Sequence, residues 1–502
     1  MAARDFLVGY DIGSSSVKAS LLDTQTGNTV ATATSPDTEL EILAPHPGWA
    51  EQDPRTWWDH IVRATARLRE AAPKALERTG AIGLSYQMHG LVIVDKNNEP
   101  LRNAIIWCDS RAVQIGEKAC ERIGRDTCLE RLLNSPGNFT AAKLAWVKAN
   151  EPEVYRRIHR MMLPGDYVAM RMTGDTCTTP SGLSEGILWD YGEHGPADIV
   201  LDHFGIDPSL IPPVRPTFSA QGALTSGAAQ VLGLPAGIPV AYRGGDQPNN
   251  AFSLRVLDPG EIAATAGTSG VVYGVTDRPL YDSRSRVNTF VHVNHAESSP
   301  RYGMLLCVNG TGILNSWLRR LLGEQAVSYV EMNAIAAQAP VGADGLIVLP
   351  YGNGAERTLG NRDTGALVQG LRFTRHSRPH LLRAAQEGIV FALNYGLDIM
   401  RASGVAVDTI RAGNANMFLS PLFRQAFATV SGARIELYDT DGAQGAARGA
   451  GVGAGIFPSA ADAFVGLRAV ETIEPDEGEK QAYDEAYAQW SAQLNHTMQG
   501  AN

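Results

Sequence analysis

Two short turns rich in glycine, serine and threonine are the first places where this chain could bind an anion. The first turn reads Gly13, Ser14, Ser15, Ser16, and the second turn reads Gly267, Thr268, Ser269. Glycine allows the backbone N–H groups of a tight turn to point at one anionic oxygen, and the hydroxyls add donors. An ordinary hairpin also uses such residues. The presence of two similar turns favours phosphate binding, although no Walker-type G-x-x-x-x-G-K-[ST] motif occurs.

Two aspartates stand where apolar runs end, Asp11 before the first turn and Asp246 after Gly244 and Gly245. Asp11 could support Mg²⁺, which in phosphate sites takes one or two carboxylates together with phosphate oxygens and water. Asp246 could accept the proton of a substrate hydroxyl. The structural alternatives are a turn cap for Asp11 and a helix cap for Asp246. With the two turns, these carboxylates favour phosphoryl transfer, in which a protein positions phosphate, neutralises charge and deprotonates the acceptor.

Candidate contacts for the accepting molecule follow two other apolar runs: Gln87, Met88 and His89 after the first, and Trp107 after the second. A polyol is bound by polar side chains beside an apolar or aromatic wall. The alternative is that the histidine and the tryptophan pack in the core. Lys18 follows the first turn on the next strand and could face bound phosphate, or it could be a solvated surface lysine.

The elements that must position these residues alternate between strands and helices, which predicts an α/β fold. Residues 6–12 and 17–23 predict a hairpin, 28–35 a third strand, and 54–72 a helix capped by Asp53 with Pro54 in its first turn. Strands are also expected at 81–86, 103–106 and 237–246. A second hairpin is predicted at 261–275, so the chain contains two related halves. We place the boundary at residue 255, giving domains 1–255 and 256–502.

Three later segments have structural interpretations. Residues 379–403 have helical spacing, and residues 476–498 predict a polar amphipathic helix with a structural role. Residues 442–456 are rich in glycine and alanine, which predicts a helix packed closely against its neighbours. Its glycines do not fit G-x-G-x-x-G after a strand, so a dinucleotide site is excluded there.

Composition narrows the class of protein. Apolar residues make up 44% and charged residues 19% of the 502 residues, as in folded globular proteins. The formal net charge is −10 without a basic block, which argues against nucleic acid as a partner. The five cysteines lack zinc-type spacing, and an odd number argues against a disulfide framework. No run predicts a signal peptide or a membrane span, so we expect a cytoplasmic protein with no membrane partner.

Several motifs together resemble the FGGY family of carbohydrate kinases. The resemblance extends over nearly the whole chain, through Tyr10 to Lys18, Pro47 to Pro54, Gln87 to Gly90, Trp107 to Arg111, Gly244 to Asp246, Ala266 to Gly270 and Pro350 to Thr358. It implies two actin-like domains of the ribonuclease H type with a cleft between them. The N-terminal domain would hold sugar and metal, and the C-terminal domain would hold the nucleotide.

The resemblance also implies roles for the candidate residues. Asp246 would be the base, Asp11 would support Mg²⁺, and both turns with Lys18 would hold the phosphates of ATP. Gln87, Met88 and His89 would contact a ketopentose such as D-xylulose, phosphorylated at its 5-hydroxyl, and Trp107 would lie beside it. Many relatives have Gly-Gly-Gly-Ala at the adenosine site where this chain has Ala412 to Ala415, so Gly413 and Asn414 are the contacts carried over.

Alternatives to this activity remain open. Asp246 is followed by Gln247, Pro248, Asn249 and Asn250 where typical relatives acting on xylulose have Asp-Asn-Ala-Ala. This difference leaves room for a kinase of another ketose, a polyol or a sugar acid. A non-catalytic sensor of sugar or nucleotide on the same scaffold is a further hypothesis, since a fold does not fix a function. The sequence leaves the oligomeric state open, with a homodimer as one alternative.

Overall fold

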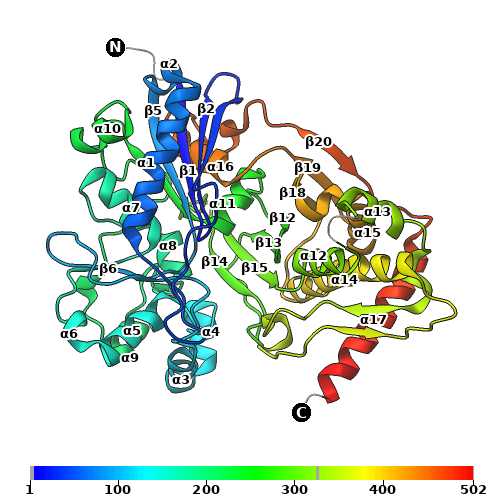
Figure 1. Cartoon of the computed structure of the whole chain (residues 1–502). Coiled ribbons are helices and arrows are strands. Elements are labelled where there is room, and N and C mark those ends of the chain that lie inside the picture. Colours follow the sequence, from blue (N-terminus) through cyan, green and yellow to red (C-terminus); the bar gives the residue numbers. More distant parts are fainter. Residues whose placement is uncertain (1–4, 324–326, 501–502) are drawn as a thin grey trace. The chain divides into compact units, whose positions relative to one another are not determined.

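The structure is a computed structural model that describes residues 5–323 and 327–500 (Figure 1). The chain forms two compact units. The first unit contains the described residues up to Leu257 together with Phe290–Tyr302 and Thr440–Leu467. The second contains Asp258–Thr289, Gly303–Asp439 and the described residues from Arg468 onward. The first unit therefore includes two segments that lie beyond residue 255 in the sequence.

The sheet of the first unit has the strand order β11-β5-β1-β2-β3. Strand β1 is antiparallel to β2, and β2 is antiparallel to β3, whereas β1, β5 and β11 are parallel neighbours. The predicted hairpin and third strand are confirmed. The bounds are β1 Phe6–Ile12, β2 Val17–Asp23, β3 Thr29–Ser35, β5 Thr79–Tyr86 and β11 Val240–Gly245, with short strands β4 Glu51–Gln52, β6 Val92–Val94, β7 Ala104–Ile105, β8 Arg160–Met162, β9 Trp189–Asp190 and β10 Gly195–Pro196 outside it.

The second unit repeats this strand order. Its main sheet runs β15-β13-β12-β18-β19-β20, in which β12 is antiparallel to β13 and parallel to β18, and β18 is parallel to β19. The second hairpin is thus confirmed as β12 and β13. The bounds are β12 Glu261–Ala266, β13 Gly270–Thr276, β14 Asn288–Val291, β15 Tyr302–Val308, β18 Thr409–Gly413, β19 Arg434–Tyr438 and β20 Ala469–Ile473, with β16 Ile347–Leu349 and β17 Leu367–Gln369 as a separate pair.

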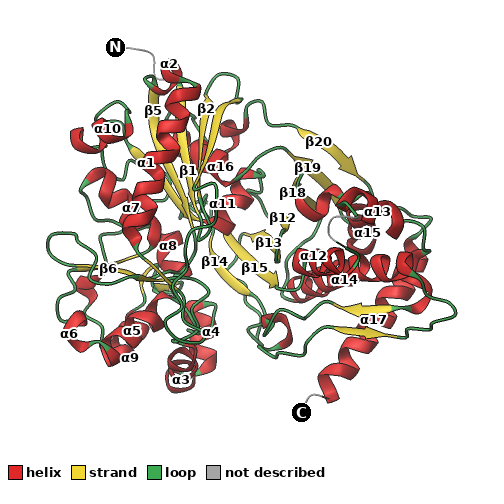
Figure 2. Cartoon of the chain, viewed as in Figure 1, coloured by secondary structure: helices red, strands yellow, loops and turns green. Residues whose placement is uncertain are grey.

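Helices cover the sheets, as the alternating pattern predicts (Figure 2). Helix α1 begins as expected: the Asp53 carboxylate accepts a hydrogen bond from the Arg55 N–H at 3.0 Å, and Pro54 occupies the first turn. The first unit has α1 Pro54–Ala71, α2 Pro73–Leu76, α3 Val113–Ile123, α4 Arg125–Leu132, α5 Thr140–Asn150, α6 Pro152–Tyr155, α7 Pro164–Thr173, α8 Pro180–Glu185, α9 Asp198–Phe204, α10 Ser226–Leu232, α11 Asp246–Ser253 and α16 Gly442–Gly453. The second has α12 Gly312–Leu321, α13 Tyr329–Ala336, α14 Arg378–Ala402, α15 Pro421–Ser431 and α17 Lys480–Gly500.

Helix α16 packs against the first sheet at backbone contact, which confirms the interpretation of the small-residue segment. A Cβ atom added to Gly9 would lie 1.9 Å from the Ala443 carbonyl oxygen, and one added to Gly83 would lie 1.9 Å from that of Ala446. No real Cβ approaches so closely. Strands β1 and β5 therefore need glycine at these two positions, and α16 brings its N-terminus to the edge where both strands end.

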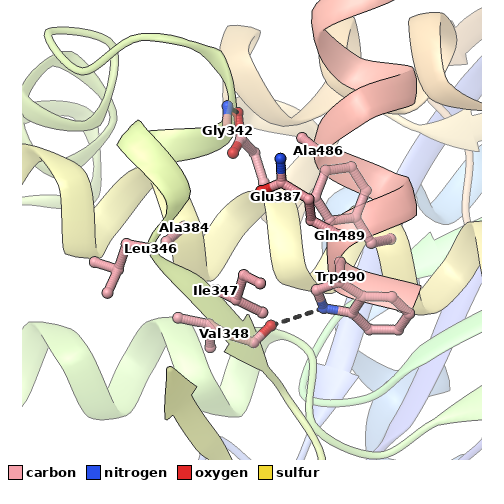
Figure 3. Close-up of a pocket in the computed structure, with 10 residues that line it drawn as sticks. Gly342, Leu346, Ile347, Val348, Ala384, Glu387, Ala486, Gln489 and Trp490 are labelled. Atoms are coloured by element: carbon pink, nitrogen blue, oxygen red, sulfur yellow. Dashed lines mark hydrogen bonds between the residues drawn. The ribbon is translucent and has the colours of Figure 1, made fainter. Parts of the chain in front are cut away.

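Helix α17 has the structural role that was predicted for the C-terminal segment. Tyr483, Trp490 and Leu494 are buried in the core of the second unit. The Trp490 indole N–H donates to the Val348 carbonyl at 2.9 Å, at the wall of a small pocket between α14, α17 and β16 (Figure 3). Glu387 in the same pocket accepts from Arg383 at 2.7 Å, so its charge is paired. No helix within residues 5–323 and 327–500 is long and apolar enough to cross a membrane.

Candidate active site

Three parallel strands of the first unit end at one edge of their sheet. Asp11 on β1 pairs with Ser85 on β5, which pairs with Gly244 on β11, and one step further Tyr86 pairs with Gly245. The first turn, the segment 87–89 and Asp246 each follow one of these strand ends. In α/β sheets, ligands bind at the carboxyl ends of parallel strands. The structure thus brings these three predicted groups to one edge of one sheet.

Asp11 is partly exposed and held at this edge by two features. The Ser85 hydroxyl donates to its Oδ1 at 2.7 Å. A Cβ added to Gly442, the first residue of α16, would lie 2.5 Å from its Oδ2, so the carboxylate faces the positive end of this helix. Burial raises the pKa of Asp11, while the Ser85 hydrogen bond and the charge of Lys18 oppose that rise. Lys18 is the direct cross-strand partner of Asp11 and is exposed, as phosphate contact requires.

Metal binding at Asp11 rests on this one carboxylate. Among residues 5–323 and 327–500, no group of three or more His, Cys, Asp or Glu side chains could hold a metal ion. A Mg²⁺ ion that keeps most of its water and binds phosphate oxygens needs only one or two carboxylates. Asp11 fits that kind of site, in which the nucleotide supplies the other ligands.

Asp246 is the first residue of α11 and is partly exposed. Burial raises its pKa to about 7, and the negative charge of Asp11 adds to the rise, while hydrogen bonds from Gln247 oppose it. The cap residue of α11 is Gly245, so Asp246 stands in the first turn, where the helix dipole favours a carboxylate. Asp246 is thus part of the helix and does not cap it, so the capping alternative is wrong. A carboxyl with a pKa near 7 is suited to accept a proton at neutral pH.

One of the sugar-contact candidates after β5, His89, is held in a strained conformation. His89 has a φ of +41°, which is uncommon for a residue with a side chain. Its ring packs edge-on against Phe139 with centroids 5.1 Å apart, and its carbonyl accepts a hydrogen bond from the Lys143 Nζ at 3.0 Å. Met88 and Gln87 are buried beside it. Such strain persists only where neighbours enforce it, often at binding sites.

Lys143 was not predicted as a site residue. It lies on α5, is completely buried, and its Nζ also donates to the Ile106 carbonyl at 3.0 Å. It therefore joins the segment 87–89 to the segment that carries Trp107. Burial lowers the pKa of Lys143 to about 7. In the sequence, Lys143 stands among alanine, leucine and tryptophan. That pattern is equally compatible with a lysine on the surface of a helix.

Trp107 is not a core residue. About half of its side chain is exposed, and its indole N–H donates to the Ser14 hydroxyl at 3.3 Å. It thus lies against the first turn, whose Gly13 N–H donates to the Ser16 carbonyl at 3.0 Å. An exposed indole beside a polar turn offers a flat apolar wall to a ligand. The structure brings Trp107 and the first turn together.

Glu185 is a second residue that sequence analysis missed. It is buried at the end of α8, and its Oε2 would lie 2.5 Å from a Cβ on Gly245, beside Met88. Neither of its carboxylate oxygens has a hydrogen bond of good geometry to any residue that the structure describes. Burial raises the pKa of Glu185 well above its usual range, the nearby Tyr86 hydroxyl opposes the rise, and the charge of Asp246 adds to it. A side chain at position 245 would therefore have to displace this carboxyl.

The second turn lies in the second unit and joins β12 to β13. Its Gly267 carbonyl accepts from the Gly312 N–H at 2.9 Å, and its Thr268 carbonyl accepts from the Ile313 N–H at 3.1 Å. Both donors belong to the N-terminus of α12. Thr268 is exposed and Ser269 partly exposed. The N-terminus of α12 thus holds the carbonyls of the turn, while the side chains of Thr268 and Ser269 are accessible.

Gly413 is the last residue of β18, the parallel neighbour of β12, and Asn414 follows it. Because Ala264 pairs with Ala412, these two residues leave the sheet at the same edge as the second turn. Asn414 is exposed, and its N–H donates to the Tyr438 carbonyl at 2.8 Å. The Asn416 Nδ2 would lie 3.7 Å from a Cβ on Gly267. The predicted nucleotide contacts of the second unit therefore gather at one edge of its sheet.

Comparison with known proteins gives consistent results for both parts of the chain. The family model described as FGGY family of carbohydrate kinases, N-terminal domain, matches residues 6–253, and the C-terminal domain model matches residues 262–456. The xylulose kinase of Escherichia coli strain K12 is 32% identical over 88% of this chain and 88% of its own length. The L-xylulose/3-keto-L-gulonate kinase of the same organism is 32% identical over 97% of this chain and 96% of its length.

Solved structures agree with the predicted fold. The xylulose kinase of Rhodospirillum rubrum superimposes with a TM-score of 0.88 at 28% identity, covering 98% of both chains. A structure described as a xyloylose kinase from Brucella ovis gives a TM-score of 0.89 at 27% identity, covering 99% of this chain and 100% of that one. These likenesses confirm the predicted α/β fold with two actin-like domains of the ribonuclease H type.

Proposed function

Because this chain belongs to the FGGY family of carbohydrate kinases, we propose that it transfers the γ-phosphoryl group of ATP to a ketopentose, converting D-xylulose to D-xylulose 5-phosphate. The observation that carries the proposal is Asp246, a carboxyl with a pKa of about 7 at the strand edge that also carries Asp11, the first turn and residues 87–89. Xylulose kinases among the relatives support the choice of sugar.

In this proposal Asp246 accepts the proton of the sugar hydroxyl as that oxygen attacks the γ-phosphorus and the bond to the β-phosphate oxygen breaks. Gln87, Met88, His89 and Trp107 orient the sugar. Asp11 holds Mg²⁺, which when bound neutralises phosphate charge. The residues of the first turn with Lys18, and the second turn with Gly413 and Asn414, hold the nucleotide through backbone N–H groups, hydroxyls and an ammonium group.

A second substrate is favoured by one specific observation. The L-xylulose/3-keto-L-gulonate kinase of Escherichia coli is as similar in sequence, at 32%, as the first xylulose kinase. The changed segment after Asp246 is consistent with a ketose of other stereochemistry or with a sugar acid. We also infer a cytoplasmic location, because none of the five cysteines is in a disulfide, as expected in a reducing compartment.

A panel of sugars tests the proposal directly. ADP release would be measured with D-xylulose, L-xylulose, 3-keto-L-gulonate, gluconate and glycerol, each with ATP and Mg²⁺. We expect the highest kcat/KM with D-xylulose. A clear preference for another member reassigns the substrate within the family. If no sugar stimulates ADP release while sugar and ATP both bind, the protein is a sensor and the proposed activity is wrong.

A further inference from the structure

The side chain of Gln52 lies between the first turn and the predicted sugar segment. Gln52 ends β4 and is only 2% exposed. Its Oε1 accepts hydrogen bonds from the Trp57 indole N–H and from the Gln87 Nε2, both at 3.1 Å. Its Nε2 donates to the Ser14 carbonyl at 2.7 Å and to the Glu41 carbonyl at 3.2 Å. Every donor and acceptor of this amide is used.

The network fixes the orientation of the amide. If the Gln52 oxygen and nitrogen exchanged places, the nitrogen would face the two donors of Trp57 and Gln87, and the oxygen would face two carbonyl oxygens. All four hydrogen bonds would be lost in a buried place, where unpaired polar groups are costly. The side chain is therefore held in one orientation.

The contact with Ser14 determines how the first turn presents its N–H groups. In a trans peptide the carbonyl and the following N–H point in opposite directions. Because the Gln52 amide binds the Ser14 carbonyl, the Ser15 N–H points away from Gln52. The Leu40 N–H binds the Ser15 carbonyl at 2.8 Å and orients the Ser16 N–H in the same manner. Ser15 is exposed, so the turn presents successive donors to an anion outside it.

The Gln87 side chain keeps one acceptor that no residue described by the structure uses. Gln87 uses its amide nitrogen on Gln52, and its backbone N–H donates to the Ile12 carbonyl at 2.9 Å. Its Oε1 is buried without a hydrogen-bond partner among the residues that the structure describes. A buried acceptor of this kind is completed by a donor from a ligand or water. A sugar hydroxyl is such a donor.

We propose that Gln52 is a positioning residue that aligns the phosphate turn and the sugar contact with one amide. This inference rests on the proposed sugar kinase activity and on the first turn as a phosphate site. The Ser14 carbonyl and the Gln87 amide are bound to opposite ends of the same rigid group. Displacement of Gln52 therefore changes both the N–H groups offered to the nucleotide and the acceptor offered to the sugar.

Two substitutions separate the two ends. Gln52→Glu keeps both acceptors but removes both donors and places a negative charge against the Ser14 carbonyl, whereas Gln52→Met removes all four hydrogen bonds. We expect Gln52→Glu to weaken ATP about tenfold, with the sugar KM changed less than threefold. We expect Gln52→Met to raise both KM values about tenfold. Gln87→Met should change the sugar KM much less when it is added to Gln52→Met than when it is made in the wild-type protein.

Gln386 provides the matched control. It is equally buried, its Nε2 donates to Asn333 at 3.0 Å and its Oε1 accepts from Ser420 at 2.8 Å, all within the second unit. Gln386→Met reports the effect of losing a buried amide elsewhere, and thermal unfolding of each variant reports folding. If Gln52→Met and Gln386→Met have the same KM values, or Gln52→Glu weakens sugar as much as ATP, the inference is wrong.

Failure of the proposed function is distinguishable from failure of this inference. Calorimetric titration of ATP into the wild type and Gln52→Glu needs no turnover. If the wild type phosphorylates none of the sugars, the proposed activity fails, yet the loss of ATP affinity in Gln52→Glu still supports its role at the turn. If the wild type is active and Gln52→Glu binds ATP with unchanged affinity, the role of Gln52 is rejected.

Discussion

The turn at residues 13–16 and the turn at residues 267–269 join the first two strands of sheets that have the same strand order. The carbonyls of the first turn are held by distant groups, the Gln52 side chain and the Leu40 N–H. Those of the second turn are held by the N-terminus of α12. The first turn has two carboxylates near it, Asp11 and Asp246, and burial together with the charge of Asp11 raises the pKa of Asp246.

The difference indicates a division of labour between similar halves. A turn supported by a helix N-terminus lies in a positive field that attracts phosphate without further chemistry. A turn beside two carboxylates requires a cation or a proton to be present, which a metal ion and a sugar hydroxyl supply. We therefore assign proton transfer and metal binding to the first unit alone, and propose that the second unit only holds the nucleotide.

The pH dependence of the reaction tests the coupling of the two carboxylates of the first unit. Asp246 must be unprotonated to act as a base, and its pKa is about 7. We expect kcat/KM for the sugar to fall about tenfold per pH unit below this value. In Asp11→Asn the residual activity should have a lower apparent pKa, because the charge that raises the pKa of Asp246 is removed. An unchanged midpoint in Asp11→Asn would contradict the coupling of the two carboxylates.

Gly312→Ala tests the support of the second turn. The added Cβ would lie 2.3 Å from the Gly267 carbonyl oxygen, so α12 and the turn must separate. We expect about a tenfold loss of ATP affinity, about 1.4 kcal/mol, with the sugar KM unchanged. Calorimetry measures the first and initial rates the second. Gly227→Ala, where a Cβ would meet no atom within 4 Å, is the control. Loss of sugar affinity instead would reverse the assignment.

Lys143→Met tests how the sugar segments are joined in the first unit. Its pKa of about 7 lies below the value of about 10.4 in an unfolded chain. Between these values the unfolded state binds more protons, so the free energy of unfolding rises with pH, by up to about 1.4 kcal/mol per unit. Denaturant unfolding between pH 7 and pH 9 should show this rise in the wild type and its loss in Lys143→Met. The exposed Lys118→Met should behave like the wild type.

Trp107→Phe is expected to have the smallest effect. It removes one long, half-exposed hydrogen bond to the Ser14 hydroxyl at 3.3 Å and keeps an aromatic wall. Such a bond contributes about 0.5–1.5 kcal/mol at most. We expect a change of two- to threefold in KM for ATP or sugar, measured from initial rates. A loss of more than thirtyfold would mean that the indole contacts a reacting group.

Sequence patterns predicted the parts of the fold that depend on local periodicity and turn chemistry. Both hairpins, the cap at Asp53 and the close packing of 442–456 follow from residue types in one segment. The pairing of Asp11 with Gly442, of Lys143 with two carbonyls, and of Glu185 with Gly245 joins residues that are distant in sequence. Hydrophobic periodicity does not predict contacts between distant residues, and the sequence does not distinguish a buried lysine or glutamate from an exposed one.

Substitution of Asp246 tests directly whether this residue is the base. Asp246→Asn keeps the size of the side chain and removes its basicity, so sugar phosphorylation should fall about 10²- to 10⁴-fold, while ATP binding changes less than threefold. Asp198→Asn, an exposed aspartate in the first turn of α9, controls for loss of a helix-terminal charge and should retain full turnover. If Asp246→Asn phosphorylates its sugar at near the wild-type rate, Asp246 is not the base and the account is wrong.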